Sequence, residues 1–173
     1  HGFILHLGMS GVVRIENDPT EYTSQKHDHV EFDLDGGARI VLNDPRRFGF
    51  LQAVSARNWQ EHPSLASMGP EPLSNDFNGP VLKARLIRRP GPIKPVLLDQ
   101  KIVAGVGNIY ACEALHMARV SPFRAANTLS ETECENLACA IRDVLNTAIE
   151  AGGSSLRDYK HTDGNLGYFQ HQF

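Results

Sequence analysis

Hydrophobic and polar residues alternate in short segments through the first third of the chain. In the segment 27–34, Val30 and Phe32 fall on one face, and His29 and Glu31 fall on the other. A period of two residues predicts a β-strand. Similar short patterns occupy residues 3–9, 38–42 and 48–54, and Asp35-Gly36-Gly37 has the composition of a hairpin turn. Together these segments predict an antiparallel sandwich or barrel.

The remainder of the chain favours helices, and the clearest is predicted over residues 131–151. Ser130 is the expected N-cap, and Glu133 completes a capping box with it. The apolar residues of this segment recur at helical spacing and form one stripe. They are Leu137, Ile141, Val144, Leu145, Ala148 and Ile149.

Proline and polar residues gather in the segment 59–78, which we interpret as a linker between two domains. The expected organisation is a β domain over residues 1–58, the linker, and a helical domain over residues 79–173. The segment 154–173 is rich in glycine and polar residues. A loop of that length is typical of a functional segment, and a disordered tail would have the same composition.

The segment 93–122 carries the most specific local pattern. Gly105-Val106-Gly107 interrupts an apolar run, and Asn108 is the expected N-cap of a helix over residues 109–118. A helix N-terminus presents unpaired N–H groups and partial positive charge, which suit a phosphate. The same glycines also serve as ordinary helix punctuation, and their spacing does not decide between the two.

Charge is segregated along the chain although its net value is only −3. Residues 16–35 hold seven carboxylates, whereas residues 83–94 hold five cations and no carboxylate. The cations are Lys83, Arg85, Arg88, Arg89 and Lys94. Beside the glycine turn, this basic run favours a nucleic acid as partner. A basic run by itself is more often a solvated face.

The composition is that of a globular protein, with 41% hydrophobic and 21% charged residues in 173. The three cysteines (Cys112, Cys134 and Cys139) cannot all pair, so we expect free thiols in a reducing cytosol. No apolar run reaches the roughly 18 residues that span a bilayer, and no secretory signal is present. Because His1 opens the chain inside a strand pattern, we expect an internal piece of a longer protein.

Five motifs occur in one order along the chain. They are HLGMSG (6–11), KHDHV (26–30), DPRRFG (44–49), GPEPL (69–73) and GVGNIYACEAL (105–115). In this order they resemble the bacterial formamidopyrimidine-DNA glycosylases. The resemblance implies an α+β protein: an antiparallel β-sandwich domain, only partly included here, followed by a helical domain with a helix–two-turns–helix motif.

The resemblance also implies an activity in base-excision repair. Enzymes of this family are monomers of the bacterial cytoplasm and nucleoid that remove 8-oxoguanine and formamidopyrimidines from duplex DNA. The damaged nucleotide is flipped out, an N-terminal proline amine attacks its sugar C1′, and the resulting Schiff base undergoes β,δ-elimination. DNA is therefore the expected partner, and no membrane is.

Individual positions take roles from the same resemblance. Met9, Arg46 and Phe48 match the residues that fill the space left by the flipped base. The DNA-contacting positions match His6, His27, Arg46, Arg89, Lys94 and Asn108, where Arg89 replaces what is often a lysine. The loop that closes over the lesion matches residues 154–168, and Ser154, Ser155 and Tyr168 are the residues of this region taken as candidates. Outside that resemblance, Met9 and Phe48 would be interpreted as core residues.

The family's catalytic groups have no counterpart in these 173 residues. The N-terminal Pro-Glu, a lysine upstream of His6 and the arginine of a C-terminal zinc finger are absent, so we expect this chain to be inactive alone. Zn²⁺ is expected only in the full-length protein, in a four-cysteine finger after Phe173. His27, His29 and Glu31 could hold a metal ion, but exposed histidines on a polar face are more often not ligands.

Two alternatives to the purine-specific enzyme remain. One is the related endonuclease VIII type, which acts on oxidised pyrimidines. The set Met9, Arg46 and Phe48, with the long loop before Phe173, favours the purine enzyme. The other is a DNA-binding relative that keeps the fold without the nucleophile.

Overall fold

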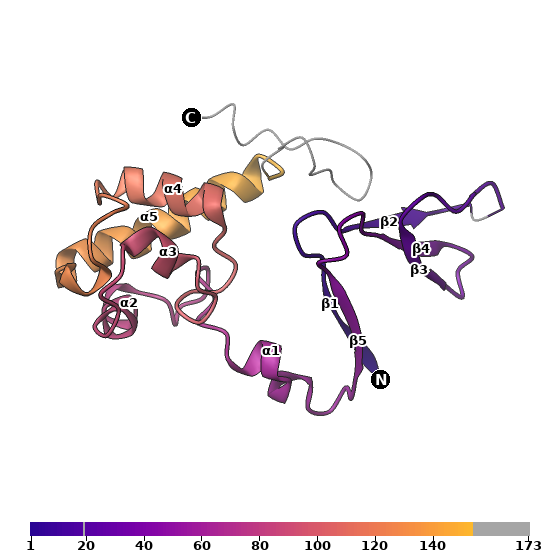
Figure 1. Ribbon diagram of the computed structural model, residues 1–173, viewed down its shortest axis with the longest axis horizontal. Helices are drawn as coiled ribbons and strands as arrows, with labels where there is room; N and C mark the ends of the chain where they lie inside the picture. Colours follow the sequence, from indigo (N-terminus) through magenta and orange to yellow (C-terminus); the bar gives the residue numbers. More distant parts are fainter. Residues whose placement is uncertain (19, 154–173) are drawn as a thin grey trace. The chain divides into compact units, whose positions relative to one another are not determined.

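The computed structural model describes residues 1–18 and 20–153, and these residues divide at Trp59 into two compact units (Figure 1). Residues 1–59, here the β unit, contain antiparallel strands. Residues 60–150, here the helical unit, contain the α-helices. The fold is therefore α+β, with antiparallel sheets followed by helices, as the sequence predicts.

The β unit contains two antiparallel sheets. In one, β1 (Gly2–His6) pairs with β5 (Phe50–Val54). In the other, β4 (Arg39–Asn43) lies between β2 (Val12–Glu16) and β3 (Asp28–Asp33). The periodicity did not predict β2, because Ile15 is exposed while Arg14 turns inward to pair with Asp28 on β3.

The hairpin between β3 and β4 confirms the turn predicted at residues 35–37. The amide of Leu34 donates to the carbonyl of Ala38 at 2.9 Å, and that of Gly37 donates to Leu34 at 2.9 Å. Gly37 has a φ of 84°, a backbone conformation that glycine adopts at no steric cost. Along β3, Val30 is half-buried and His29 exposed, which confirms the predicted alternation.

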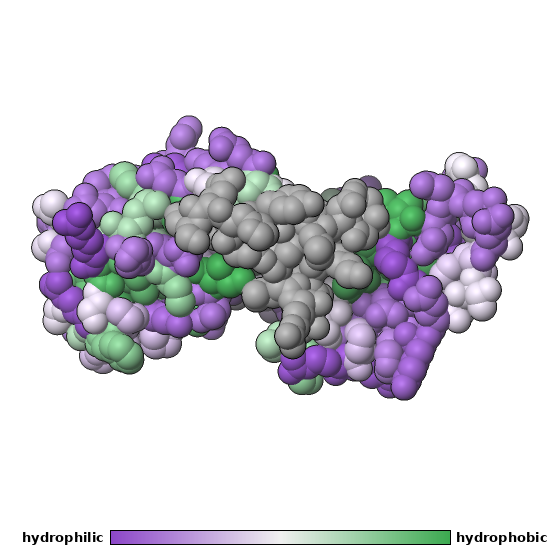
Figure 2. All heavy atoms as spheres, turned by 90° about the horizontal axis from the view of Figure 1, so that it is seen from above, coloured by the Kyte–Doolittle hydropathy of each residue, from purple (hydrophilic) through white to green (hydrophobic). Residues whose placement is uncertain are grey.

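The apolar core of the β unit is small. Among its described residues only Val41, Leu42 and Asp44 are buried along both main chain and side chain, and the ring centroids of Phe3 and Phe32 lie 5.3 Å apart between the sheets. Several large apolar side chains remain exposed, and apolar patches show among hydrophilic ones on the face seen in Figure 2. Buried polar contacts therefore contribute much of what holds this unit in a single conformation.

Asp28 is the centre of the largest of these polar networks. Its side chain is fully buried and accepts hydrogen bonds from the side chains of Arg14, Tyr22 and Asn43 and from the amide of Gln25. Burial by itself raises the pKa of this carboxyl. The hydrogen bonds and the Arg14 charge outweigh that effect and lower the pKa to about 2.

The helical unit has an extensive apolar core. Its elements are η1 (Trp59–Glu61), α1 (Pro63–Ala66), α2 (Gly79–Leu86), α3 (Ile93–Leu97), α4 (Asn108–Met117), η2 (Ala126–Thr128) and α5 (Glu131–Glu150). Helices α2 and α4 pack against α5, and Phe77, Leu82, Leu115, Leu137 and Ile141 are buried between these elements. No helix within residues 1–18 and 20–153 has the length and apolar character that crossing a membrane requires.

Helix α5 confirms the predicted capping box. The amide of Glu133 donates to Ser130 Oγ at 3.2 Å, and the amide of Ser130 donates to a Glu133 carboxylate oxygen at 2.8 Å. The predicted stripe is correct from Leu137 to Ala148 and wrong at Ile149, which is exposed. Ile149 lies one turn after the half-buried Leu145, at the edge of the stripe rather than at its centre.

Substitution of Asp28 by asparagine should lower the free energy of unfolding by about 2 kcal/mol at neutral pH, because the carboxyl pKa falls from 3.8 to about 2 on folding. A depressed pKa stabilises the folded state above the unfolded value. The contribution is therefore lost as the pH falls from about 4 to about 2. Urea unfolding across this range measures the effect.

The control is Asp35→Asn in the exposed hairpin turn. It should keep the acid dependence of the parent chain, whereas Asp28→Asn should reduce it. Equal acid dependence of the parent chain and of Asp28→Asn would contradict the role of Asp28.

Candidate nucleic-acid interface

Asp44, the residue after β4, organises the loop that leads to β5. Only 4% of its surface is exposed. One carboxylate oxygen accepts from the amide of Gly49 at 2.9 Å, and the other accepts from Ser10 Oγ at 2.9 Å. Its main-chain carbonyl accepts from His29 Nε2 at 2.9 Å. The bond from Gly49, followed by those from Ser10 and the loop amides, outweighs burial and lowers the pKa of Asp44.

The turn after β1 touches this loop through its backbone. At Gly8, whose φ is 63°, a Cβ would lie 2.8 Å from the main-chain carbon of Phe48. At Gly49 it would lie 2.5 Å from the carbonyl oxygen of His6. Both glycines are required by close backbone approach. The turn and the loop are therefore held in register by backbone contact and by the Ser10–Asp44 hydrogen bond.

Met9 and Phe48 project from these two segments into solvent. Met9 is 73% exposed and Phe48 57% exposed. The predicted strands 3–9 and 48–54 were too long: β1 ends at His6 and β5 begins at Phe50. The left-handed Gly8 and the Asp44-centred loop stop strand pairing before either side chain reaches the core.

Arg46 lies against the face of Phe48. Its guanidinium carbon is 4.6 Å from the ring centroid, a cation–π contact. Its neighbour Arg47 adopts a φ of 55° and donates its amide to the carbonyl of Asp44 at 3.3 Å. The loop thus presents an aromatic ring and a guanidinium together on a backbone fixed by Asp44.

The two histidines predicted to contact DNA, His6 and His27, have different environments. His6 is exposed, with its ring 5.5 Å from that of Phe50. His27 precedes β3 with a φ of 75°, so the prediction that it lies within the strand was wrong, although its ring centroid lies 6.3 Å from that of His29. A left-handed residue breaks the alternation on which that prediction relied. Within residues 1–18 and 20–153, no three histidine, cysteine or acidic side chains are grouped to hold a metal ion.

In the helical unit, Gln100 closes the turns between α3 and α4. Its side-chain oxygen accepts from the amide of Gly105 at 2.7 Å, and its side-chain nitrogen donates to the carbonyl of Val106 at 3.2 Å. Gly105 has a φ of 73°. The apolar residues Ile102, Val103, Ala104 and Val106 of these turns are buried, whereas Gly105, Gly107 and Asn108 are exposed. The glycine side of the motif therefore faces solvent.

Helix α4 begins at Asn108, and its N-cap is Gly107 rather than Asn108 as predicted. The extended backbone of Gly107, with a ψ of 179°, already interrupts the helix one residue earlier. Among the described residues, no side chain caps this end, and none has an atom within 4 Å of a Cβ placed on Gly107. The first-turn amides are open to a ligand, and Asn108 stands beside them.

Some of the cations in the basic run, residues 83–94, make contacts within the helical unit. Arg89 pairs with Asp99 at 3.3 Å, Arg85 donates to the carbonyl of Lys101 at 2.7 Å, and Lys83 donates to the carbonyl of Leu129. Of the five cations, only Arg88 and Lys94 make no side-chain hydrogen bond or ion pair in the part of the chain that the structure describes. The predicted cationic face is therefore smaller than its sequence suggests.

The predicted site residues divide between the two units. His6, Met9, His27, Arg46 and Phe48 belong to the β unit, and Arg89, Lys94 and Asn108 belong to the helical unit. Ser154, Ser155 and Tyr168 lie outside the described residues. Sequence reasoning placed Asp44 in a tight loop that presents Phe48, but it did not predict the hydrogen bonds of Asp44 with Ser10 and Gly49. It missed Ser10 and Gln100 as organising residues, and Gln100 had no signal in the sequence.

Two family models match the chain. The model for the formamidopyrimidine-DNA glycosylase N-terminal domain matches residues 1–51, and the model for the H2TH domain of the same enzymes matches residues 68–160. A formamidopyrimidine-DNA glycosylase of Dinoroseobacter shibae is 54% identical, and one of Ruegeria pomeroyi is 51% identical. In both cases 98% of the chain is covered, and it spans 62% of the relative's length.

Solved structures agree with these matches. The MutM (Fpg) protein of Thermus thermophilus superposes with a TM-score of 0.85 at 43% identity, covering 98% of this chain and 62% of that one. The Lactococcus lactis Fpg in complex with DNA containing an abasic site superposes with a TM-score of 0.85 at 32% identity, covering 98% and 61%.

Substitution of Asp44 by asparagine should release the loop of residues 44–49, because the amide of Gly49 and the hydroxyl of Ser10 lose a charged acceptor. The expected result is hydrogen exchange at the Gly49 amide that is roughly tenfold faster or more. Asp35→Asn is the matched control and should leave that amide unchanged. Unaltered exchange in Asp44→Asn would show that the loop is held by other contacts.

Proposed function

This chain belongs to the formamidopyrimidine-DNA glycosylase family, and we propose that it forms the DNA-binding part of a base-excision repair glycosylase for oxidised purines. The substrates are 8-oxoguanine and formamidopyrimidines in duplex DNA. One observation carries the proposal: the Asp44-centred loop holds Phe48 and Arg46 in solvent, beside the turn that carries Met9. The chain spans about 62% of its curated relatives, so the activity is that of the whole protein.

These three side chains have the properties needed to replace a flipped nucleotide. Extruding a base costs a few kcal/mol of stacking and pairing. An aromatic wedge such as Phe48 replaces stacking, and the flexible Met9 fills the irregular space beside it. Arg46 carries donors that suit the base left without its partner, and contact with the Phe48 ring keeps it at that position.

The helical unit supplies phosphate contacts in the same proposal. The uncapped first turn of α4 offers main-chain amides, and Asn108 adds a side-chain donor. Lys94 on α3 adds a cation without a side-chain partner in the described residues. Duplex DNA as partner is supported by the solved relatives from Lactococcus lactis, which were determined with lesion-containing DNA.

The chemistry of the proposal rests on the family resemblance. An N-terminal prolyl amine of the full-length protein attacks C1′ of the flipped nucleotide and displaces the base. The resulting Schiff base then undergoes β,δ-elimination, which is the lyase step. A polypeptide of these 173 residues begins with His1 and carries no prolyl amine at its terminus, so we propose that it is inactive alone.

Zinc belongs to the full-length protein in this proposal. Cys112, Cys134 and Cys139 are free thiols, and the described residues contain no group of three metal-ligating side chains. The metal therefore does not fit the described part, and its four-cysteine finger would stabilise a segment outside these 173 residues. We further propose that the whole protein acts as a monomer in the bacterial cytoplasm, on nucleoid DNA.

Replacing Phe48 and Asn108 separately by alanine should separate two kinds of DNA contact. Asn108→Ala should weaken binding to damaged and undamaged duplexes equally, by roughly threefold to tenfold, because a phosphate contact carries no base information. Phe48→Ala should mainly lower the preference for the duplex with 8-oxoguanine. Fluorescence anisotropy with the two duplexes measures both effects.

The matched control is Asn146→Ala, at an exposed position of α5, which should change neither affinity. The division of roles would be disproved if both variants weakened both duplexes to the same extent.

Borohydride trapping tests the proposed chemistry. The 173-residue chain should form no covalent adduct with 8-oxoguanine DNA, since it lacks the prolyl amine. The full-length protein should form one, and replacement of its N-terminal proline should abolish it. An adduct formed by the 173-residue chain would show that another amine is the nucleophile. A full-length protein that binds lesions without trapping would identify a non-catalytic relative.

A further inference from the structure

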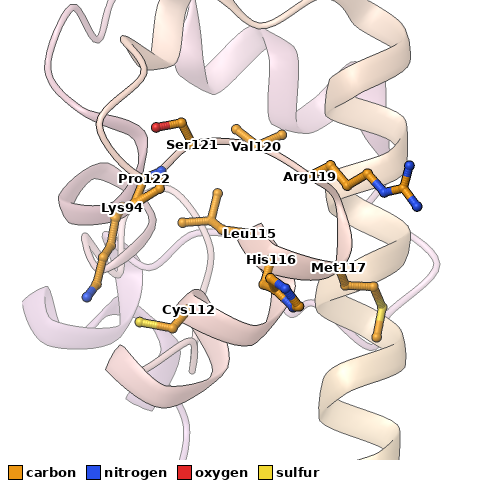
Figure 3. A pocket seen from close by; sticks show the side chains of 9 residues that line it. All are labelled: Lys94, Cys112, Leu115, His116, Met117, Arg119, Val120, Ser121 and Pro122. Atoms are coloured by element: carbon orange, nitrogen blue, oxygen red, sulfur yellow. The ribbon is translucent and has the colours of Figure 1, made fainter. Parts of the chain in front are cut away.

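A cavity of about 680 Å³ in the helical unit shares only Lys94 with the residues of the proposed function (Figure 3). It lies among α3, the second half of α4 and the loop that follows α4. Its lining residues are Lys94, Cys112, Leu115, His116, Met117, Arg119, Val120, Ser121 and Pro122. Its volume lies within the range of roughly 300–1,000 Å³ that is typical of ligand sites.

The lining is predominantly aliphatic. Leu115, Val120 and Pro122 contribute carbon surface, and Met117 adds a flexible thioether that adapts to different shapes. Phe123, the residue after Pro122, is 84% exposed. Apolar surface therefore extends from the cavity onto the adjoining loop, as at sites that receive another molecule's side chain.

The charged groups of the lining are basic. Lys94 and Arg119 are cations, His116 can donate a hydrogen bond, and none of the nine described lining residues is acidic. No side-chain partner of Lys94, His116 or Arg119 occurs among residues 1–18 and 20–153. Figure 3 shows Lys94 and Arg119 on opposite sides of the view. In a chain of net charge −3, this is a local concentration of positive charge around an apolar cavity.

Arg119 occupies a backbone position that normally favours glycine. It follows the C-cap residue Ala118 of α4 with a φ of 55°, and its amide donates to the carbonyl of His116 at 3.0 Å. A glycine there would end the helix equally well. The side chain is therefore not explained by the helix terminus itself.

We propose that this cavity binds an acidic peptide segment of a partner protein. An apolar side chain of the peptide enters the cavity, and carboxylates on either side of it pair with Lys94 and Arg119. The two cations flank the apolar lining, so an occupant that neutralises both must carry negative charge on both sides of an apolar group. An acidic peptide with one hydrophobic anchor has that pattern.

A nucleic acid fits the lining less well. Bases bind to aromatic platforms or to groups that pair with their edges, and none of the nine lining residues is tyrosine, phenylalanine or tryptophan. Apart from Lys94, the cavity lies toward the C-terminal end of α4, whereas Asn108 and the first-turn amides, which have the other proposed phosphate contacts, lie at its N-terminal end. A helix of this length separates its ends by about 15 Å. Because Lys94 also has a proposed DNA contact, it is not varied in the test.

The probe is a short fluorescein-labelled peptide with a single phenylalanine flanked by aspartates, titrated with the whole 173-residue chain. Fluorescence anisotropy should show saturable binding that weakens with added salt. The same peptide with serine in place of phenylalanine should bind at least about fivefold more weakly.

Three variants locate the site. Arg119→Asn removes the charge with a residue that tolerates the left-handed backbone, and His116→Gln removes the imidazole at an exposed position. Ser121→Trp places a bulky side chain at the exposed cavity wall. Each should weaken peptide binding at least about fivefold, while Arg57→Asn, a matched loss of charge in the β unit, should not.

Thermal unfolding checks that each variant folds as the parent chain does. Binding to duplex DNA is measured in parallel. Unchanged DNA affinity of Arg119→Asn with weakened peptide binding would support the proposal. It would be overturned by absence of saturable binding, by equal binding of the serine peptide, or by variants that weaken DNA binding and not peptide binding. The last result would assign the cavity to the nucleic-acid surface.

Discussion

The candidate interface of the β unit depends on one buried carboxylate. Asp44 connects the turn of residues 7–11 to the loop of residues 44–49 through Ser10 and Gly49, and its carbonyl is bonded to His29. Among the described residues, the bond from Ser10 to Asp44 is the only side-chain hydrogen bond that joins these two segments, and close backbone approach at Gly8 and Gly49 supports it. The exposed Met9 and Phe48 are useful to a DNA-binding protein only if their backbones are fixed, since ordering them on binding would cost conformational entropy.

The two units are stabilised by different kinds of contact. The helical unit buries a continuous set of large apolar side chains between α2, α4 and α5. The β unit has only a small buried apolar set among its described residues and relies on buried carboxylates, Asp28 and Asp44, with their hydrogen-bond partners. Such networks tolerate little change, because removing one partner leaves a buried polar group unsatisfied. The same property makes them suited to positioning a site.

In the helical unit, burial decides which side of the two-turn motif meets a ligand. The apolar residues from Ile102 to Val106 turn inward, apart from Gly105, and Gln100 accepts from the amide of Gly105 and donates to the carbonyl of Val106. Gly107 then opens α4 without a side-chain cap. The exposed amides of a helix start are thus a consequence of how the preceding turns are packed. The opposite end of α4 has a different character, with aliphatic residues and cations around one cavity.

The sequence by itself determined the features that arise from local pattern. The alternation along β3, the Gly37 turn and the Ser130–Glu133 capping box all follow from interactions within a few residues, so periodicity and composition suffice to predict them. The five ordered motifs likewise identify the family from the sequence alone. Local pattern was less successful where a strand or helix ends, as at Met9, Phe48 and Asn108.

Only the tertiary structure decided what those end residues do. Met9 and Phe48 have the pattern of core residues, and contacts between segments distant in sequence, through Gly8, Ser10 and Asp44, turn them outward. Arg89 is one cation among five in the sequence, yet folding brings Asp99 against it. The cavity beside α4 gathers Lys94 and Arg119 from separate elements. Such placements depend on long-range contacts, which local periodicity does not encode.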